Sequence, residues 1–72
     1  MENIKIGDQI KALRNRHGIT QVSFAKAIHI SPQAVSKWER NINYPDIHLL
    51  PIIARFFGTT IDALFTVCDP EQ

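Results

Sequence analysis

The feature that most constrains this chain is a pair of short helical segments, with only two residues between the end of the first and the cap of the second. Thr20 and Ser31 each precede a stretch of helical periodicity, and their hydroxyl oxygens can accept a backbone N–H that a helix start leaves unpaired. Pro32 follows at the first helical position, where its missing N–H is not needed. The sequence therefore predicts helices over residues 21–28 and 32–40. So short a connection makes them meet at a steep angle, which leaves the second helix prominent on the surface.

The predicted helix over 32–40 has two faces of different chemistry. At about 100° per residue, Val35 and Trp38 point to one side. The opposite side, called the polar face here, has no apolar residue and consists of Gln33, Ser36, Lys37 and Arg40. Such amide, hydroxyl and cationic groups bind base edges and phosphates, although an ordinary solvated helix face would look similar. For Trp38, core packing beside Val35 is a better explanation than stacking on a single-stranded base.

Helical segments are also predicted towards the two ends of the chain, and no strand signal interrupts them. A first helix is expected over residues 4–17, with Gly18 placed to end it in the left-handed conformation. Near the other end, Thr60 can cap a short final helix. Further apolar residues at helical spacing are Ile6, Ile10, Leu13, Phe24, Ala25, Ile28, Leu50, Ile53, Ala54, Phe57, Ile61, Leu64 and Phe65.

The segment after the loop "NINYP" contains a proline that a helix does not readily accept. Asp46 can cap a fourth helix, which Gly58 closes. Pro51 lies inside it, so either it bends the opening turns or residues 46–50 form a separate turn before the helix proper. The whole chain is thus predicted to be all-α, with five helices.

Composition narrows the class of protein. A chain of 72 residues, 44% hydrophobic and 21% charged, suits one globular domain near the size at which a single core is marginally stable. Its net charge of +1 means that any nucleic-acid footprint depends on local placement of Lys and Arg. The start lacks the apolar run of a signal peptide, and the apolar stretch "LLPIIARFF" is too short to span a membrane. Since the single cysteine, Cys68, forms no internal disulfide, we expect a cytoplasmic protein.

The chain has no residue pattern typical of an enzyme. His17, His29 and His48 lack the i, i+4 spacing of a helical metal site, and there is no paired cysteine motif. A nucleophile with its base, a glycine-rich phosphate loop and a pair of sequestered carboxylates are also missing from the sequence. We therefore expect no catalysis, no metal and no cofactor.

Several elements of the sequence match one family in their order and spacing: Gln21, the two-residue turn, "VSKWER" and the later "YPD", "LL" and "FFG". Through them the chain resembles the Cro and lambda-repressor-like helix-turn-helix family, also called the xenobiotic-response-element family. The likeness covers about residues 4–65 and leaves a short tail over 66–72. It implies that residues 1–72 form one compact five-helix domain. In such a domain the helix over 32–40 lies in the major groove of double-stranded DNA, while the helix before it crosses the backbone.

The resemblance also implies DNA contacts for individual residues. The family's base-reading positions are matched by Gln33, Ser36 and Lys37. Gln33 can offer donor and acceptor together to adenine, Lys37 can reach guanine or a phosphate, and Ser36 can touch either or only let the helix approach closely. The residues expected to approach phosphates are Gln21, Ser31, Arg40, Asn41 and Asn43. Exposed side chains without a DNA contact are the alternative.

Four further residues are expected to support the helix over 32–40. Arg14 and Glu39 correspond to a family pair that links the first helix to the end of the third, although two separate solvated charges would give the same sequence. Val35 and Trp38 match the family's core anchors. These four residues would orient the helix without reading bases themselves.

The chain departs from the family at two positions where relatives commonly have glycine. His29 stands in the turn between the second and third predicted helices, and Asn41 follows the third. A left-handed backbone is expected at both, and His and Asn adopt it more readily than most residues. The fold is expected to tolerate both residues, at some loss of stability for His29.

Two classes of function remain. The leading one is sequence-specific binding of double-stranded DNA by a transcriptional regulator, expected to be a repressor; the alternative is a protein-interaction module such as an antitoxin-like domain. The polar face favours DNA, because a protein interface would place aromatic or aliphatic anchors at its centre. Family members often bind palindromic operators as two-fold dimers, so we expect a homodimer. The apolar run over 64–68 is a candidate dimer contact, unless Leu64 is used wholly in the core.

Overall fold

The computed structural model describes residues 5–65, and all of the regular secondary structure in this part of the chain is helical. Its elements are α1 (Ile6–Arg16), α2 (Gln21–Ala27), α3 (Pro32–Glu39), the 3-10 turn η1 (Ile47–Leu49), α4 (Leu50–Phe57) and α5 (Ile61–Leu64). No strand occurs in the described range. The prediction of an all-α chain with five α-helices is confirmed, with ends that differ from the expected ones by one or two residues.

Side-chain caps begin three of the helices, as predicted. The hydroxyl oxygens of Thr20, Ser31 and Thr60 accept the backbone N–H three residues further on, at 3.0, 3.2 and 3.1 Å. The prediction for Asp46 is wrong, because its side chain makes no capping bond. Instead, its backbone carbonyl accepts the N–H of Leu49 at 2.9 Å and starts a separate 3-10 turn. Of the two alternatives for the proline segment, the separate turn is therefore the correct one.

Helices α1 to α4 all end in the same compact motif. The left-handed residues are Gly18, His29, Asn41 and Gly58, with φ between 61° and 68°. In each case the next backbone N–H reaches back to the carbonyl five residues earlier, at 2.8 to 2.9 Å. The left-handed conformations expected at these positions are confirmed. Two of the four lie on either side of α3, so its direction is set by hydrogen-bonded turns at both ends.

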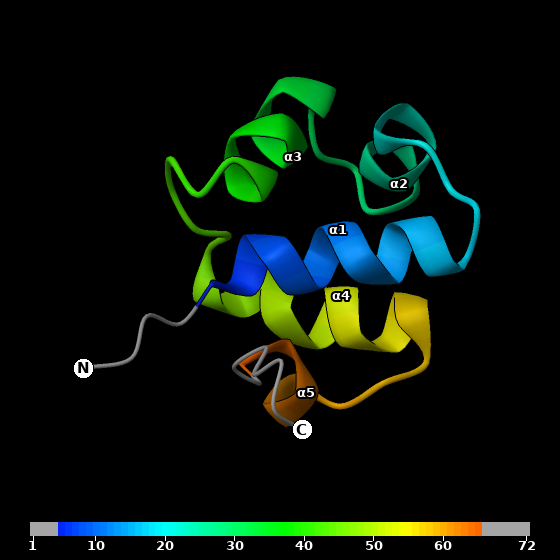
Figure 1. Cartoon of the computed structure of the whole chain (residues 1–72), viewed down its shortest axis with the longest axis vertical. Coiled ribbons are helices and arrows are strands. Elements are labelled where there is room, and N and C mark those ends of the chain that lie inside the picture. The colour runs from blue at the N-terminus through cyan, green and yellow to red at the C-terminus, as the bar shows by residue number, and fades with distance from the viewer. Residues whose placement is uncertain (1–4, 66–72) are drawn as a thin grey trace.

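The helices share a single core of buried apolar residues. α1 runs through the middle, with α2 and α3 on one side and α4 and α5 on the other (Figure 1). The buried apolar residues are Ile6, Ile10, Phe24, Ala25, Ile28, Val35, Trp38, Leu49, Leu50, Ile53, Ala54, Phe57 and Leu64, with Leu13 partly buried against them. Of the apolar residues at helical spacing in the last predicted helix, Ile61 and Phe65 are exposed. Because α5 is only one turn long, it directs one large side chain, Leu64, fully inward.

The first turn of α1 touches the end of α3 through a glycine. Gly7 is buried, and a Cβ atom added there would overlap the backbone carbonyl of Trp38 and come within 2.9 Å of Asn41 Oδ1. No sequence pattern singles out this glycine. A close backbone approach therefore helps to fix where α3 lies on α1.

Candidate nucleic-acid interface

The two faces of α3 differ in burial, as the sequence predicts. Val35 and Trp38 are buried against the core. On the polar face, Gln33, Lys37 and Arg40 are exposed and Ser36 is half-buried. α3 lies at the outer edge of the molecule, on the side of α1 away from α4 and α5 (Figure 1). The polar face is therefore open to a ligand as large as a duplex.

The side chains on this face differ in how they are held. Within residues 5–65, the side chains of Gln33 and Lys37 make no hydrogen bond. Arg40 donates from Nε to the carbonyl of Ser36 at 3.4 Å, so it lies back along the last turn of α3. Ser31, at the start of the helix, uses its oxygen as the cap and keeps its O–H proton for another acceptor. Free donors thus occur along the length of α3.

Arg14 and Glu39 form the predicted pair between α1 and the end of α3. Nε of Arg14 lies 2.7 Å from Oε2 of Glu39, and Nη2 donates to Oε1 at 3.0 Å. The side chains are 13% and 3% exposed, so this bidentate pair is largely removed from water. Arg14 also donates from Nη1 to the carbonyl of Ile19 at 2.8 Å. The hydrogen bond to Glu39 raises the pKa of Arg14 above its ordinary value, although burial opposes the shift.

The side chain of Gln21 joins this pair, which the sequence did not suggest. Its Nε2 donates to Oε1 of Glu39 at 3.0 Å, so the first residue of α2 is tied to the end of α3. We call Arg14, Gln21 and Glu39 the Glu39 network. Eighteen residues separate Gln21 from Glu39, and no sequence periodicity links positions on different helices. One amide hydrogen of Gln21 remains for another acceptor.

Of the other residues expected near phosphates, Asn41 makes a side-chain hydrogen bond within residues 5–65 and Asn43 does not. Asn41 donates from Nδ2 to Oδ1 of Asp8 at 3.0 Å, which turns its amide towards the first turn of α1. The exposed side chain of Asn43 makes no hydrogen bond within the described range. The structure therefore gives Asn41 a role in joining α1 to α3 that sequence reasoning missed, and leaves Asn43 open.

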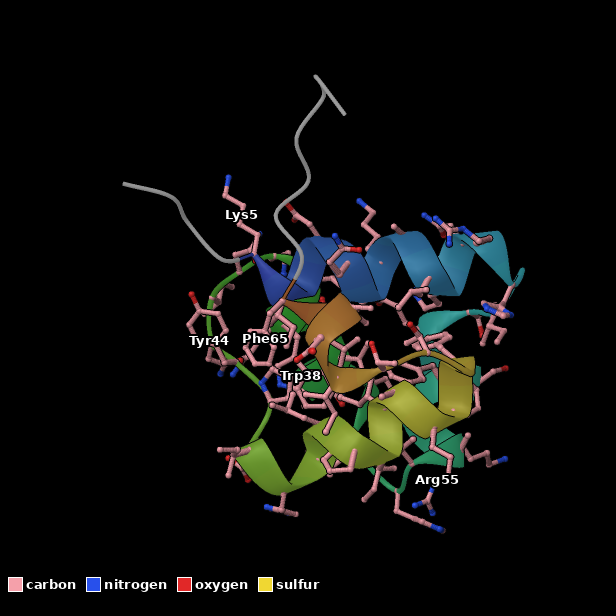
Figure 2. The ribbon with its side chains drawn as sticks, turned by 90° about the horizontal axis from the view of Figure 1, so that it is seen from below. Lys5, Trp38, Tyr44, Arg55 and Phe65 are labelled. Carbon is pink, nitrogen blue, oxygen red and sulfur yellow. The ribbon has the colours of Figure 1, made fainter. Side chains whose placement is uncertain are left out.

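Positive charge beyond α3 is scattered. Figure 2 shows Lys5 beside the start of α1 and Arg55 on α4, well separated in that view. Lys11 and Lys26 are exposed on α1 and α2. Lys37 and Arg40 therefore give α3 its own positive charge without a basic field around the whole molecule.

Two features are absent from residues 5–65, the part of the chain that the structure describes. No helix there is long and apolar enough to cross a membrane. No group of three or more His, Cys, Asp or Glu side chains in that range is placed to hold a metal ion.

Comparison with known proteins assigns the chain to a family. A model of the helix-turn-helix family matches residues 10–64. The chain is 33% identical over 63 residues to the HTH-type transcriptional activator BcrR of Enterococcus faecalis, covering 88% of this chain and 31% of BcrR. It is 34% identical over 55 residues to the antitoxin PezA of Streptococcus pneumoniae serotype 4, covering 76% of this chain and 35% of PezA. It thus spans about a third of the length of each.

A solved structure agrees in fold. The P22 c2 repressor protein, in complex with a synthetic operator, has a TM-score of 0.79 to this chain at 28% identity, over 85% of this chain and 92% of the repressor chain. The chain therefore belongs to the helix-turn-helix family, and the predicted Cro and lambda-repressor-like fold is confirmed. It is a helix-turn-helix domain of the kind found in transcription regulators.

Proposed function

We propose that this domain binds double-stranded DNA sequence-specifically, with α3 in the major groove. The observation that carries the proposal is the state of Gln33 and Lys37. Both side chains are exposed and without an internal partner in the described range, on a helix whose opposite face is anchored by Val35 and Trp38. Free amide and ammonium donors on a fixed helix are what direct readout of base edges requires. The likeness to a repressor solved in complex with a synthetic operator supports binding to double-stranded DNA.

Phosphate contacts would hold the helix in register. Arg40 and Asn43 are exposed beyond the end of α3, and Ser31 keeps a free O–H at its start. Gln21 and Asn41 each retain one amide hydrogen after bonding within the protein. Contacts of this kind add affinity for every sequence alike, so they position the domain while the base contacts specify.

The regulatory part of the proposal is repression through a palindromic operator, bound by a homodimer. One α3 covers only a few base pairs, and two-fold dimers of such domains read half-sites about 34 Å apart. Tyr44, Ile47 and Phe65 are 65%, 82% and 40% exposed, so apolar side chains are available for contact with a second copy. Of the run proposed as a dimer contact, Leu64 is fully used in the core, Phe65 is exposed, and residues 66–68 lie outside the described range.

An antitoxin-like protein-interaction module is the second candidate, which the likeness to PezA favours. Against it, the polar face offers no aromatic or aliphatic anchor for a protein partner. We keep DNA binding as the main proposal for this reason. The same proposal includes a cytoplasmic location, no metal or cofactor, and no catalytic activity.

Selection of duplexes from a random DNA pool tests the proposal. The wild type is compared with the Gln33→Ala, Lys37→Ala double variant at moderate salt, and Arg55→Ala serves as the control. That control removes one exposed positive charge from α4, on the other side of α1. We expect a short palindromic consensus for wild type and control, and its loss in the double variant. A wild type that enriches no consensus would contradict sequence-specific binding and favour the interaction module.

A further inference from the structure

We infer that Glu39 is a positioning residue for phosphate recognition: its buried carboxylate fixes the amide of Gln21 before DNA arrives. The inference rests on the proposed function, because it takes Gln21 to contact a phosphate. It adds a dependence between residues on two helices that sequence-based reasoning treated separately, one as a phosphate contact and the other as structural support.

The acceptor that holds Gln21 is itself held by several hydrogen bonds. Oε1 of Glu39 accepts from both Arg14 and Gln21 at 3.0 Å, while Oε2 accepts from Arg14 at 2.7 Å. The side chain of Glu39 is 3% exposed, and Arg14 is held in turn by the carbonyl of Ile19. Since α1, α3 and the loop before α2 all contribute, the carboxylate has a single position to offer.

This arrangement bears on affinity because a glutamine side chain has several rotatable bonds. An unrestrained side chain loses that freedom when it binds, and the loss reduces affinity. Gln21 is half-buried and already bonded, whereas Gln33 is exposed and makes no side-chain hydrogen bond in the described range. Gln21 should therefore lose less freedom than Gln33 when DNA binds.

The charge of the network is also suited to a site beside DNA. A lone carboxylate next to a phosphate would repel it, but Arg14 neutralises Glu39 through two hydrogen bonds. The amide of Gln21 donates one hydrogen to this neutral pair and keeps the other. The Glu39 network thus orients a donor without adding a negative charge at the interface. It also fixes the start of α2 relative to the end of α3.

A double-mutant cycle on DNA affinity tests the inference. The duplex is the consensus selected by the wild type, at one fixed salt concentration. The network is removed by Arg14→Met with Glu39→Leu, because an apolar pair of similar volume keeps a buried site folded where a single substitution would not. Gln21→Ala is then measured in the wild-type and network-free backgrounds. Gln33→Ala is the matched control, since the same side chain is truncated at a position outside the network.

We expect Gln21→Ala to weaken binding about tenfold in the wild-type background and about threefold or less without the network. Gln33→Ala should have the same effect in both backgrounds. Equal effects of Gln21→Ala in the two backgrounds would overturn the inference while leaving DNA binding intact. A Gln21→Ala variant that binds as tightly as the wild type would overturn the inference and the phosphate contact. Failure of the proposed function itself would appear earlier, as a wild type without a consensus.

A second measurement decides the matter if the network-free protein does not fold. Relaxation of the side-chain amide nitrogens in the free wild type compares Gln21 with Gln33 directly. The inference predicts a clearly higher order parameter for Gln21. Equal order parameters for the two glutamines would overturn it, because Gln21 would then be no more fixed than an unrestrained side chain.

Discussion

The two ends of α3 are held in different ways. At its C-terminal end, α3 is tied to α1 and α2 by the Glu39 network, by the bond from Asn41 to Asp8 and by the backbone approach at Gly7. At its N-terminal end, a serine cap starts the helix, and Gln33 then points out without a partner in the described range. The C-terminal end therefore makes the contacts that join α3 to α1 and α2. Near the N-terminal end, Gln33 can be replaced with little effect on the fold.

The largest effect is expected at the tied end, from Glu39→Ala. This change leaves Arg14 without its partner in a site that is largely removed from water, and should lower the free energy of unfolding by about 3 to 5 kcal/mol. Urea unfolding followed by circular dichroism measures it. Asp46→Ala is the control, because that exposed carboxylate makes no capping bond, and should change stability by less than about 0.5 kcal/mol. Similar losses of unfolding free energy for the two variants would contradict the conclusion that Glu39 holds the C-terminal end of α3 in place.

The next effect is expected from Gly7→Ala, which places a methyl group against the Trp38 carbonyl. Since a backbone atom must move, we expect a loss of about 2 to 3 kcal/mol in the same unfolding assay. Gly18→Ala has open space around the new Cβ but a φ of +66°, so it should lose only about 1 kcal/mol. A smaller loss at Gly7 than at Gly18 would show that the approach of α1 to α3 is loose.

At the free end, Gln33→Ala should reduce discrimination between the consensus and a site altered at one base pair, by about 1 to 3 kcal/mol. Its free energy of unfolding should stay within about 0.5 kcal/mol of the wild type, because the side chain is exposed. Competition binding with the two duplexes measures the first quantity, and urea unfolding the second. An equal loss of affinity for all duplexes would make Gln33 a phosphate contact instead of a base reader.

The smallest effects are expected from glycine at the two left-handed positions beside α3. His29→Gly should be neutral or stabilising by up to about 1 kcal/mol, since it relieves the left-handed backbone of His29. Asn41→Gly also relieves a left-handed backbone, but it removes the hydrogen bond to Asp8. Its free energy of unfolding should therefore be about 0.5 to 1 kcal/mol lower than that of His29→Gly. Thermal melts compare them. A destabilised His29→Gly variant would reveal an unrecognised partner of that side chain.

Sequence reasoning predicted what local rules determine. Caps at Thr20, Ser31 and Thr60 depend on residues next to one another in the chain. The left-handed ends at His29 and Asn41 followed from the family resemblance, because relatives commonly have glycine at those positions. The buried side of α3 follows from periodicity alone, and the ion pair between α1 and α3 followed from the family resemblance.

The contacts that were missed join residues far apart in the sequence. The bonds from Gln21 to Glu39 and from Asn41 to Asp8 span 18 and 33 residues, and the fit of Gly7 against Trp38 depends on how two helices cross. The exposure of Phe65 escaped prediction because it depends on α5 ending after one turn. A single sequence has no local signal for any of these.

The central claim is that α3 reads sequence with its free side chains, while the contacts at its C-terminal end hold the helix in place. The most direct test is the ratio of dissociation constants for the selected duplex and a scrambled duplex of equal length, at one salt concentration. We predict a ratio of about a thousandfold for the wild type and less than about tenfold for the Gln33→Ala, Lys37→Ala variant, with equal unfolding midpoints. A variant that keeps the wild-type ratio, or a wild type that binds both duplexes equally, would contradict the claim.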